Sequence, residues 1–444
     1  MGPRAIRCLH GIDIDPDAVA AARAALAARC GDARAAARAI RCADALAGPV
    51  RRRFDAVIAN PPWVEPRRWR RELPRIDVRG FESARRGKVD LSLPFLERAQ
   101  TWLAPGGRGG FLIQSRFFKT DYGAAARRML RGLVAEIEDF GDAELFDGCA
   151  TYTAMLILER GAESVRYRSG GRSIRIPAER LGDAPWTFAD EAGSALDAEL
   201  AARHGRLGEH AALRICVGLQ TLFGRVYRIV DGKNGFGDGV EIERAALRPL
   251  CRNRGFAPLR DQLADAFVIF PYEGDREIRW PEFRARFPKA AAYLKSQREI
   301  LEHAVEMPVE KDRWHLYTRP QNLRALARPK VLFPMTVRRV VAAVDERGDV
   351  YPDNVNVNAL LADGVDLFAL AGLLCSRLFD RLARLHAGQA QGGFLKFNRQ
   401  FAARVPMPLA ALRGPLGAEL ALAARARDFA AIDRLAEQIY GVNV

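Results

Sequence analysis

An apolar run that ends at two consecutive prolines constrains the fold of this chain most. Residues 54–59 read Phe-Asp-Ala-Val-Ile-Ala, and Asn60-Pro61-Pro62-Trp63 follow directly. A short continuous apolar run with β-branched and aromatic residues predicts a parallel strand that is buried on both faces. Because proline cannot donate to a strand ladder, the strand must end at Pro61. The next residues then lie at its carboxyl edge, where open α/β sheets bind ligands.

The tetrapeptide at this edge carries groups that suit a planar amine. Asn60 offers a side-chain carbonyl, Pro61 a backbone carbonyl and Trp63 a flat ring face. Two fixed acceptors and a ring face match the exocyclic amine of a nucleobase, which has two hydrogens beside one ring. The alternative is a surface turn, since Asn-Pro dipeptides are frequent in loops.

Two further acids end the strands that are predicted upstream. A strand over residues 6–14 carries Asp13 at its carboxyl end, and a helix over residues 18–29 follows it. A second strand over residues 37–42 leads to Asp44. Nucleotide-binding α/β folds place an acid at such an edge to bind ribose hydroxyls, which is the role expected for Asp13. Asp44 is expected to accept from the adenine amino group of a bound cofactor. The alternative for Asp13 is a helix-entry residue.

The chain from Ile6 to Glu159 resembles the core of the gamma-class N6-adenine DNA methyltransferases, the TaqI-like and Eco57I-like enzymes. GIDIDP resembles their ribose-binding motif, ADAL their adenine-contact motif and NPPW their catalytic motif. LAPGGRGGFLIQSRFF resembles the helix-turn-strand that follows, with the strand expected over residues 109–114. Two strands over residues 134–140 and 151–158 look like the antiparallel hairpin that closes such a sheet.

The resemblance implies an α/β fold, a Rossmann-like class I methyltransferase sheet followed by an α+β target-recognition domain. It implies S-adenosylmethionine as methyl donor and double-stranded DNA as partner, with the target adenine flipped out of the duplex. Phe146 matches the aromatic that stacks on the flipped base opposite Trp63. The implied catalytic residues are Asn60, Pro61, Pro62 and Trp63, and the implied cofactor-binding residues are Asp13, Asp44 and Asn60.

One departure from the family pattern concerns the donor pocket. The family has a first strand and a glycine-rich loop before the ribose-binding motif, whereas no G-x-G precedes Asp13 in this sequence. The sheet is therefore expected to be N-terminally incomplete. Either an upstream polypeptide supplies the missing piece, or the sequence is a truncated reading frame.

The sequence divides into four expected regions. Residues 1–160 are the partial methyltransferase domain, 161–211 a linker, 212–410 the DNA target-recognition domain and 411–444 a C-terminal helix. Looser motifs after residue 218, among them RPLCRNR, VIFPY and a closing P-x-P turn, resemble the recognition domain of the same enzymes. Its candidate DNA contacts are Arg225, Arg252, Arg254, Arg338, Arg339, Lys396 and Arg399. An exposed, salt-bridged arginine is the alternative for each.

The net charge of +15 favours a polyanionic partner, since binding to phosphates releases counterions. The Arg-rich segment over residues 64–88 is expected to contact DNA or to act as a lid, with a solvated loop as the alternative. Seven cysteines without a C-x-x-C pair argue against a disulfide framework and a zinc site, and indicate a reducing cytoplasm. The histidines show no ligand spacing, so no metal is expected. No apolar run reaches the length of a membrane span.

The sequence therefore predicts a site-specific adenine DNA methyltransferase of a restriction-modification or phage-defence system, working with an upstream polypeptide or an endonuclease. One alternative is a catalytically inactive DNA-specificity fragment. Another is a methyltransferase that acts on RNA or on protein glutamine, because NPP-aromatic motifs serve those substrates too.

Overall fold

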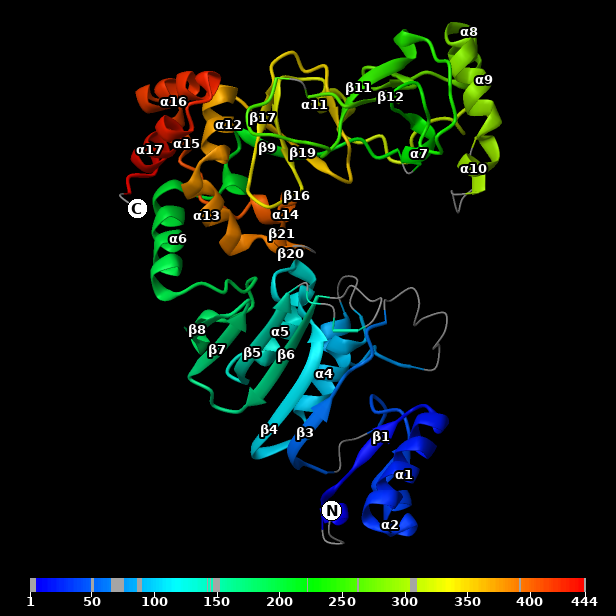
Figure 1. Cartoon of the computed structure of the whole chain (residues 1–444), viewed down its shortest axis with the longest axis vertical. Helices are drawn as coiled ribbons and strands as arrows, with labels where there is room; N and C mark the ends of the chain where they lie inside the picture. The colour runs from blue at the N-terminus through cyan, green and yellow to red at the C-terminus, as the bar shows by residue number, and fades with distance from the viewer. Residues whose placement is uncertain are drawn as a thin grey trace. The chain divides into compact units, whose positions relative to one another are not determined.

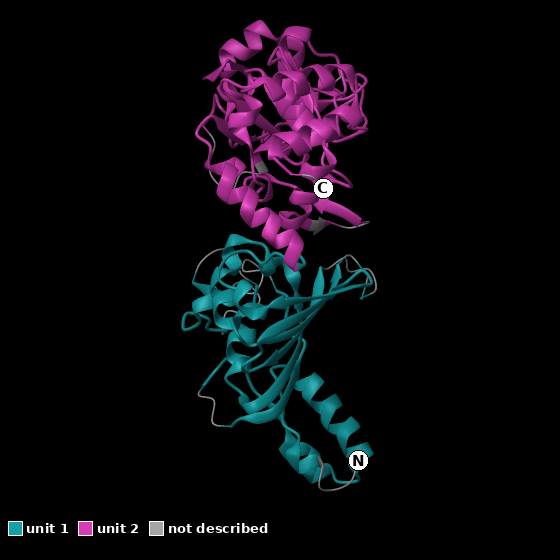
Figure 2. Ribbon diagram, turned by 90° about the vertical axis from the view of Figure 1, so that its left-hand side faces the viewer, with its two compact units in different colours: residues 1–190 teal, residues 191–444 magenta. Residues whose placement is uncertain are grey.

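The computed structural model of the chain describes residues 5–48, 52–64, 76–85, 90–141, 143, 145–146, 152–221, 223–261, 263–303, 310–390 and 393–442. The chain forms two compact units, unit 1 from Met1 to Asp190 and unit 2 from Glu191 to Val444 (Figure 2). The elements of both are labelled in Figure 1. Residues 65–75 and 86–88 of the Arg-rich segment lie outside the described residues.

A six-stranded mixed sheet forms the centre of unit 1, with strand order β3-β4-β6-β5-β7-β8. Its strands are β3 (Phe54–Ala59), β4 (Leu103–Gln114), β5 (Val134–Gly141), β6 (Thr153–Glu159), β7 (Ser164–Ser169) and β8 (Arg172–Pro177). β3 and β4 are parallel, whereas β6 runs antiparallel to both β4 and β5. The predicted closing hairpin is thus confirmed as β5 and β6, and the carboxyl ends of β3, β4 and β5 share one edge.

β4 starts earlier than the sequence predicted. Leu103 already pairs with Phe54, and the register then shifts so that Arg108 pairs with Ala56. The residues from Pro105 to Gly107, expected as a turn, form a bulge inside the strand. Gly106 takes a positive φ of 75°, a conformation that side chains other than glycine rarely adopt.

The first two strands of unit 1 form a sheet of their own. β1 (Gly11–Asp13) and β2 (Ile40–Cys42) are parallel, and α1 (Pro16–Cys30) and α2 (Ala33–Ala39) follow β1. The strand predicted over residues 37–42 is therefore shorter, because the Ala-rich segment before Ile40 is helical. Asp32 caps that helix by accepting from the backbone N–H of Ala35 at 2.8 Å.

Two helices cover the main sheet and complete its core. α4 (Ser92–Gln100) lies between β3 and β4 in the chain, and α5 (Ala124–Leu130) follows β4. Leu96, Phe111 and Leu156 are fully buried in the shared hydrophobic cluster. Residues 161–190, expected as part of a linker, add β7 and β8 to this sheet. The α/β architecture agrees with the Rossmann-like expectation.

Unit 2 is an α+β body built from small sheets and helices. Its sheets have the strand orders β17-β15-β19-β9, β10-β12-β11-β18, β16-β21-β20 and β13-β14. The strands are β9 (Leu213–Val217), β10 (Arg228–Ile229), β11 (Leu247–Cys251), β12 (Ala266–Ile269), β13 (Tyr272–Glu273), β14 (Arg276–Glu277), β15 (Lys330–Pro334), β16 (Thr336–Val337), β17 (Ala343–Asp345), β18 (Tyr351–Pro352), β19 (Val357–Ala362), β20 (Gly388–Ala390) and β21 (Phe394–Lys396).

The helices of unit 2 pack around these sheets in two hydrophobic clusters. They are α6 (Glu191–His204), α7 (Gly224–Tyr227), α8 (Trp280–Arg286), α9 (Pro288–Ser296), α10 (Arg298–His303), α11 (Leu323–Leu326), α12 (Leu367–Cys375), α13 (Arg377–His386), α14 (Arg399–Ala402), α15 (Leu409–Leu412), α16 (Pro415–Ala426) and α17 (Phe429–Tyr440).

The C-terminal segment forms two helices instead of the single helix expected. α16 ends at Arg427, which takes a left-handed φ of 56°. The side chain of Asp428 then caps α17 by accepting from the backbone N–H of Ala431 at 3.0 Å. The cap favours a new helix start, so the chain turns at this point.

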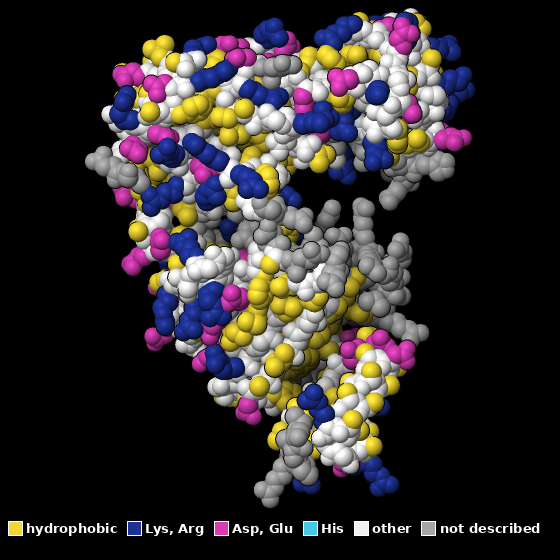
Figure 3. Space-filling model, in the orientation of Figure 1, with side chains coloured by type: hydrophobic (Ala, Val, Ile, Leu, Met, Phe, Trp, Pro, Cys, Tyr) yellow, Lys and Arg dark blue, Asp and Glu magenta, His cyan; other side chains and the backbone are white. Residues whose placement is uncertain are grey.

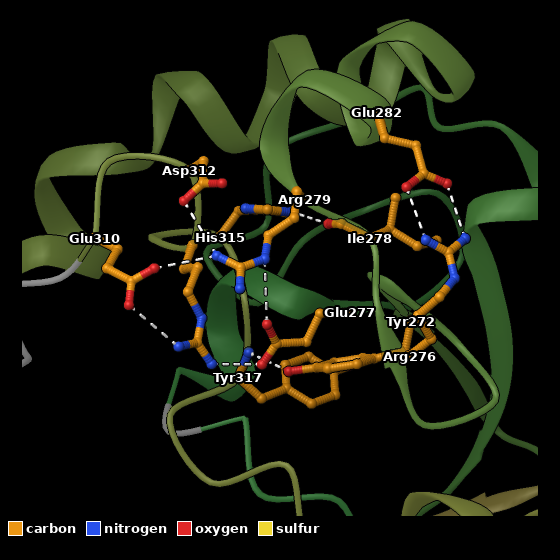
Figure 4. Close-up of polar contacts among 11 residues, drawn as sticks. Tyr272, Arg276, Glu277, Ile278, Arg279, Glu282, Glu310, Asp312, His315 and Tyr317 are labelled. Carbon is orange, nitrogen blue, oxygen red and sulfur yellow. Dashed lines mark hydrogen bonds and ion pairs between the residues drawn. The ribbon is translucent and has the colours of Figure 1, made fainter.

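An ion-pair network ties β14 and α8 to the segment before His315 (Figure 4). Its pairs are Arg276–Glu282, Arg279–Glu310, Arg279–Asp312, Arg313–Glu277 and Arg313–Glu310. These arginines are already neutralised by acids within unit 2.

Candidate active site at the carboxyl edge of the unit 1 sheet

The predicted tetrapeptide lies where β3 ends. β3 stops at Ala59, Asn60 is exposed and Pro61 is buried. The Asn60 side chain makes no hydrogen bond to any residue that the structure describes. Its carbonyl oxygen is therefore free to accept from a ligand at the sheet edge.

Trp63 and Phe146 meet at the same edge, although 83 positions separate them in the sequence. Their ring centroids are 5.5 Å apart and the rings are inclined at 81°, an edge-to-face contact. Phe146 follows β5 and is 37% exposed, and Trp63 is half-buried. The indole nitrogen of Trp63 is buried and has no hydrogen-bond partner among the residues that the structure describes. A flat ring needs about 3.5 Å on each face, so a base can lie between these rings only after they separate.

The loop around Trp63 is held by the start of α4. The backbone N–H of Leu91 donates to the carbonyl of Val64 at 3.2 Å. Asp90, just before this helix, accepts from the backbone N–H of Ser92 at 2.8 Å and from its hydroxyl. Burial raises the pKa of Asp90 above its usual range. This support was not predicted from the sequence, although Asp-x-Ser before an apolar run is a helix-start signal.

Asp13 ends β1 and Asp44 follows β2, so both lie at the carboxyl edge of this pair of strands. Asp13 pairs with Cys42, and the N–H of Ala43 donates to the backbone carbonyl of Asp13 at 2.8 Å. One oxygen of Asp13 accepts from the N–H of Asp15, and one oxygen of Asp44 from the N–H of Leu46. The other oxygen of each carboxylate has no hydrogen-bond partner among the described residues. Both acids can therefore still accept from a ligand.

Two contacts connect the β1–β2 pair to the main sheet. The rings of His10 and Phe54 lie 5.2 Å apart, and Arg98 of α4 donates to the carbonyl of Leu46 at 2.7 Å. No described strand pairs with the second edge of β3, and Ile58 in that strand is 89% exposed. Ile12 in β1 is 45% exposed. Figure 3 shows hydrophobic side chains gathered on the visible face of unit 1.

A pocket of about 370 Å³, which was not predicted from the sequence, opens beside α5 and is lined in part by residues of the Arg-rich segment over residues 64–88. Glu82, Ser83, Tyr122 and Arg128 line it. The hydroxyl of Ser83 is buried without a hydrogen-bond partner, while Arg128 is paired with Glu82 at 3.1 Å.

Some of the candidate DNA-contacting side chains of unit 2 already contact other residues of the chain. Arg252 donates to the backbone carbonyl of Asp265 at 3.0 Å, and Arg339 to the carbonyl of Cys375 at 2.6 Å. Arg225 lies over the ring of Phe236.

The remaining candidates are exposed. Arg338 lies over the ring of Phe394. Arg254, Lys396 and Arg399 have no partner among the residues that the structure describes.

Two searches of the described part of the chain gave negative results. No group of three or more His, Cys, Asp or Glu residues lies close enough together to hold a metal ion. None of the described helices is long and apolar enough to cross a membrane.

Comparison with known proteins gives consistent matches. Residues 45–146 match the Eco57I restriction-modification methylase family. The Type II methyltransferase M.XhoI of Xanthomonas vasicola is 28% identical, over 90% of this chain and 76% of its own length. The Type II methyltransferase M.PaeR7I of Pseudomonas aeruginosa is 26% identical, over 90% of this chain and 72% of its own.

The fold is similar to that of the Type IIL restriction-modification enzyme MmeI, solved in complex with DNA, with a TM-score of 0.61 and 13% identity. That match covers 98% of this chain, which spans 63% of the length of the MmeI chain. Sequence and fold together thus point the same way. Over residues 45–146 the chain resembles the Eco57I restriction-modification methylases.

Proposed function

We propose that the chain is the modification enzyme of a restriction-modification or phage-defence system, transferring a methyl group from S-adenosylmethionine to N6 of a flipped-out adenine in duplex DNA. The observation that carries the proposal is the sheet edge on which the unpaired amide of Asn60 and the ring pair Trp63–Phe146 occur together. The residues that match the family, 45–146, include Asn60, Trp63 and Phe146.

The proposed chemistry depends on the hydrogen-bond acceptors at this edge. The lone pair of an adenine amine is delocalised into its ring, so the nitrogen is a poor nucleophile. The Asn60 side chain and the Pro61 carbonyl, which Pro62 fixes in place, accept the two amino hydrogens. Nitrogen then moves toward tetrahedral geometry and its lone pair becomes available. Such preorganised acceptors lower the barrier without a covalent intermediate.

Trp63 and Phe146 supply the stacking surfaces for the extrahelical base. Their present edge-to-face contact is the closed form, and the base enters as the rings part. A ring lost to mutation removes stacking but leaves the acceptors of the amine in place.

The residues present fit S-adenosylmethionine. Asp13 and Asp44 each keep one carboxylate oxygen without a partner in the described part of the chain, and the nucleoside part of the donor presents ribose hydroxyls and an adenine amine. When bound, the donor supplies a methyl group on a positively charged sulfur. Asp13 would hold the ribose and Asp44 the adenine, with Asn60 beside the reacting centre.

A second candidate is a DNA-specificity fragment that gains the donor pocket only with an upstream polypeptide. The open edge of β3, with Ile58 largely exposed, favours it. Calorimetry with S-adenosylmethionine separates the two functions. Heat of binding with the chain alone supports the complete enzyme, and heat only after the upstream polypeptide is added supports the split one.

Methylation measured on duplex DNA, ribosomal RNA and protein tests the substrate. The proposal expects N6-methyladenine in DNA. Methyl transfer only to RNA or to glutamine side chains would contradict it.

A further inference from the structure

Two long stretches of unit 2 contain no acidic residue. They are residues 313–344 and residues 381–418. Between them they supply β16, β20, β21 and α14, which lie beside one another in Figure 1. These four elements therefore contribute none of the carboxylates that neutralise arginines in the rest of the unit and that would repel a polyanion.

The three strands β16, β21 and β20 form an antiparallel ribbon, hereafter the ribbon, with two different faces. Thr336 pairs with Lys396 and Val337 with Leu395. Val337 is buried and Leu395 packs against the core, so their face is internal. Because side chains alternate along a strand and paired residues share a face, Thr336, Lys396 and Phe394 lie on the outer one.

The outer face of the ribbon carries cations without acidic partners. Arg338, directly after β16, lies with its guanidinium carbon 4.8 Å from the centre of the Phe394 ring. Lys396 of β21 is exposed, and so is Arg399, which lies outside the ribbon at the start of α14; neither side chain has a hydrogen-bond or ion-pair partner among the described residues. The ring beneath Arg338 orients a planar group that has five donors.

A neighbouring loop extends this surface. The side-chain amide of Asn253 donates to the carbonyl of Thr336 at 2.8 Å. The next residue, Arg254, is exposed and unpaired among the described residues. By contrast, Arg276, Arg279 and Arg313 are held in the ion-pair network of Figure 4.

We propose that the ribbon is the surface of unit 2 that enters the major groove of the target DNA. Lys396 and Arg399 bind phosphates, and Arg338 reads the edge of a guanine. A β-ribbon fits the major groove, where arginine bonds to the two acceptors of guanine at once. The inference rests on the proposed function in that duplex DNA is the substrate.

Binding of the full chain to a labelled duplex of about 30 base pairs tests the phosphate contacts, measured by fluorescence anisotropy at several salt concentrations. Lys396→Gln and Arg399→Gln should each weaken binding, and each should lower the slope of log affinity against log salt by about one. Arg284→Gln is the matched control, because Arg284 of α8 is exposed and unpaired among the described residues but lies outside the ribbon. Melting temperatures verify that all variants fold.

Selection of bound sequences from a random duplex library tests Arg338. The wild type should enrich a motif that contains a guanine, and Arg338→Ala should lose the preference at one position by about tenfold or more while the rest of the motif stays. Unchanged motifs, or ribbon variants that bind as Arg284→Gln does, would overturn the inference even if the chain methylates DNA. A wild-type chain that binds and methylates only RNA or protein would instead overturn the proposed function.

Discussion

The ring of Phe146 meets the ring of Trp63 edge to face, with 5.5 Å between their centroids. One ring follows β3 and the other follows β5, so the order of strands in the sheet brings them to a common edge. A base that stacks between the two rings would have to occupy the space in which they now touch. Base binding therefore requires the two rings to move apart.

Phe146→Ala should impair capture of the base more than binding of the duplex. Stacking of a base on an aromatic side chain contributes about 1–3 kcal/mol, which is about 5- to 150-fold in the equilibrium for the extrahelical base. Duplex DNA with 2-aminopurine at the target position reports base flipping by its fluorescence. Phe146→Trp is the matched control and should retain the signal. An Ala variant as fluorescent as the wild type would show that Phe146 is not a stacking wall.

The buried ion pair Lys330–Asp345 should be among the most sensitive positions of unit 2. Lys330 is 0% and Asp345 3% exposed, and Asp345 also accepts from the backbone N–H groups of Gly348 and Val350. Asp345→Ala leaves a buried ammonium unpaired, so the free energy of unfolding should fall by about 3–5 kcal/mol.

Urea denaturation measures the effect of Asp345→Ala. Asp275→Ala is the control, since Asp275 pairs with an exposed Arg324 and such surface pairs contribute roughly 0–1 kcal/mol. Equal losses of unfolding free energy in the two variants would mean that the buried Lys330–Asp345 pair contributes no more than a surface pair.

Unit 2 should lose stability in mild acid because of His315. Its Nε2 lies 2.9 Å from the carbonyl of Ile278, its side chain is fully buried, and burial lowers its pKa from 6.5 to about 4. The folded state thus holds the neutral ring. Above pH 6.5 the titration of His315 does not lower the free energy of unfolding. As the pH falls from 6.5 toward 4, protonation of the ring in the unfolded state lowers this free energy by up to about 3 kcal/mol.

Urea denaturation at pH 7, 5.5 and 4.5 measures this dependence. His315→Gln keeps a donor for Ile278 but does not titrate, so its curve should be flatter over that range. If the wild type and the variant show the same pH dependence, the loss of stability comes from other groups.

The residues that end strands could be predicted from the sequence, whereas pairings between distant segments could not. Proline at 61 and 62 determines where β3 stops, because no ladder continues through them. The helix over residues 33–39 was not predicted, because a strand was expected from residue 37. The high helix propensity of the alanines and the cap at Asp32 favour the helix instead. The left-handed backbone of Arg427 and the cap at Asp428 divide the C-terminal segment into two helices. The spacing of the apolar residues does not indicate this break.

The strand-end positions suggest Asn60, Asp13 and Asp44 as site residues, whereas Phe146 is suggested only through the family resemblance. Their roles stay predictions, and the sequence did not indicate how the side chains are arranged. Charge alone could not distinguish Arg252, which is bound to Asp265, from Lys396, which is free. That distinction depends on which acids the fold brings near each cation.

The central claim is that Asn60 activates the adenine amine. Its most direct test is methyl transfer from S-adenosylmethionine into duplex DNA by the full chain, alone and with the proposed upstream polypeptide, followed by mass spectrometry of the nucleosides. The wild type should form N6-methyladenine, and Asn60→Ala should abolish it while binding DNA as the wild type does. Retained turnover in Asn60→Ala, or a methyl group on another atom, would contradict the assignment.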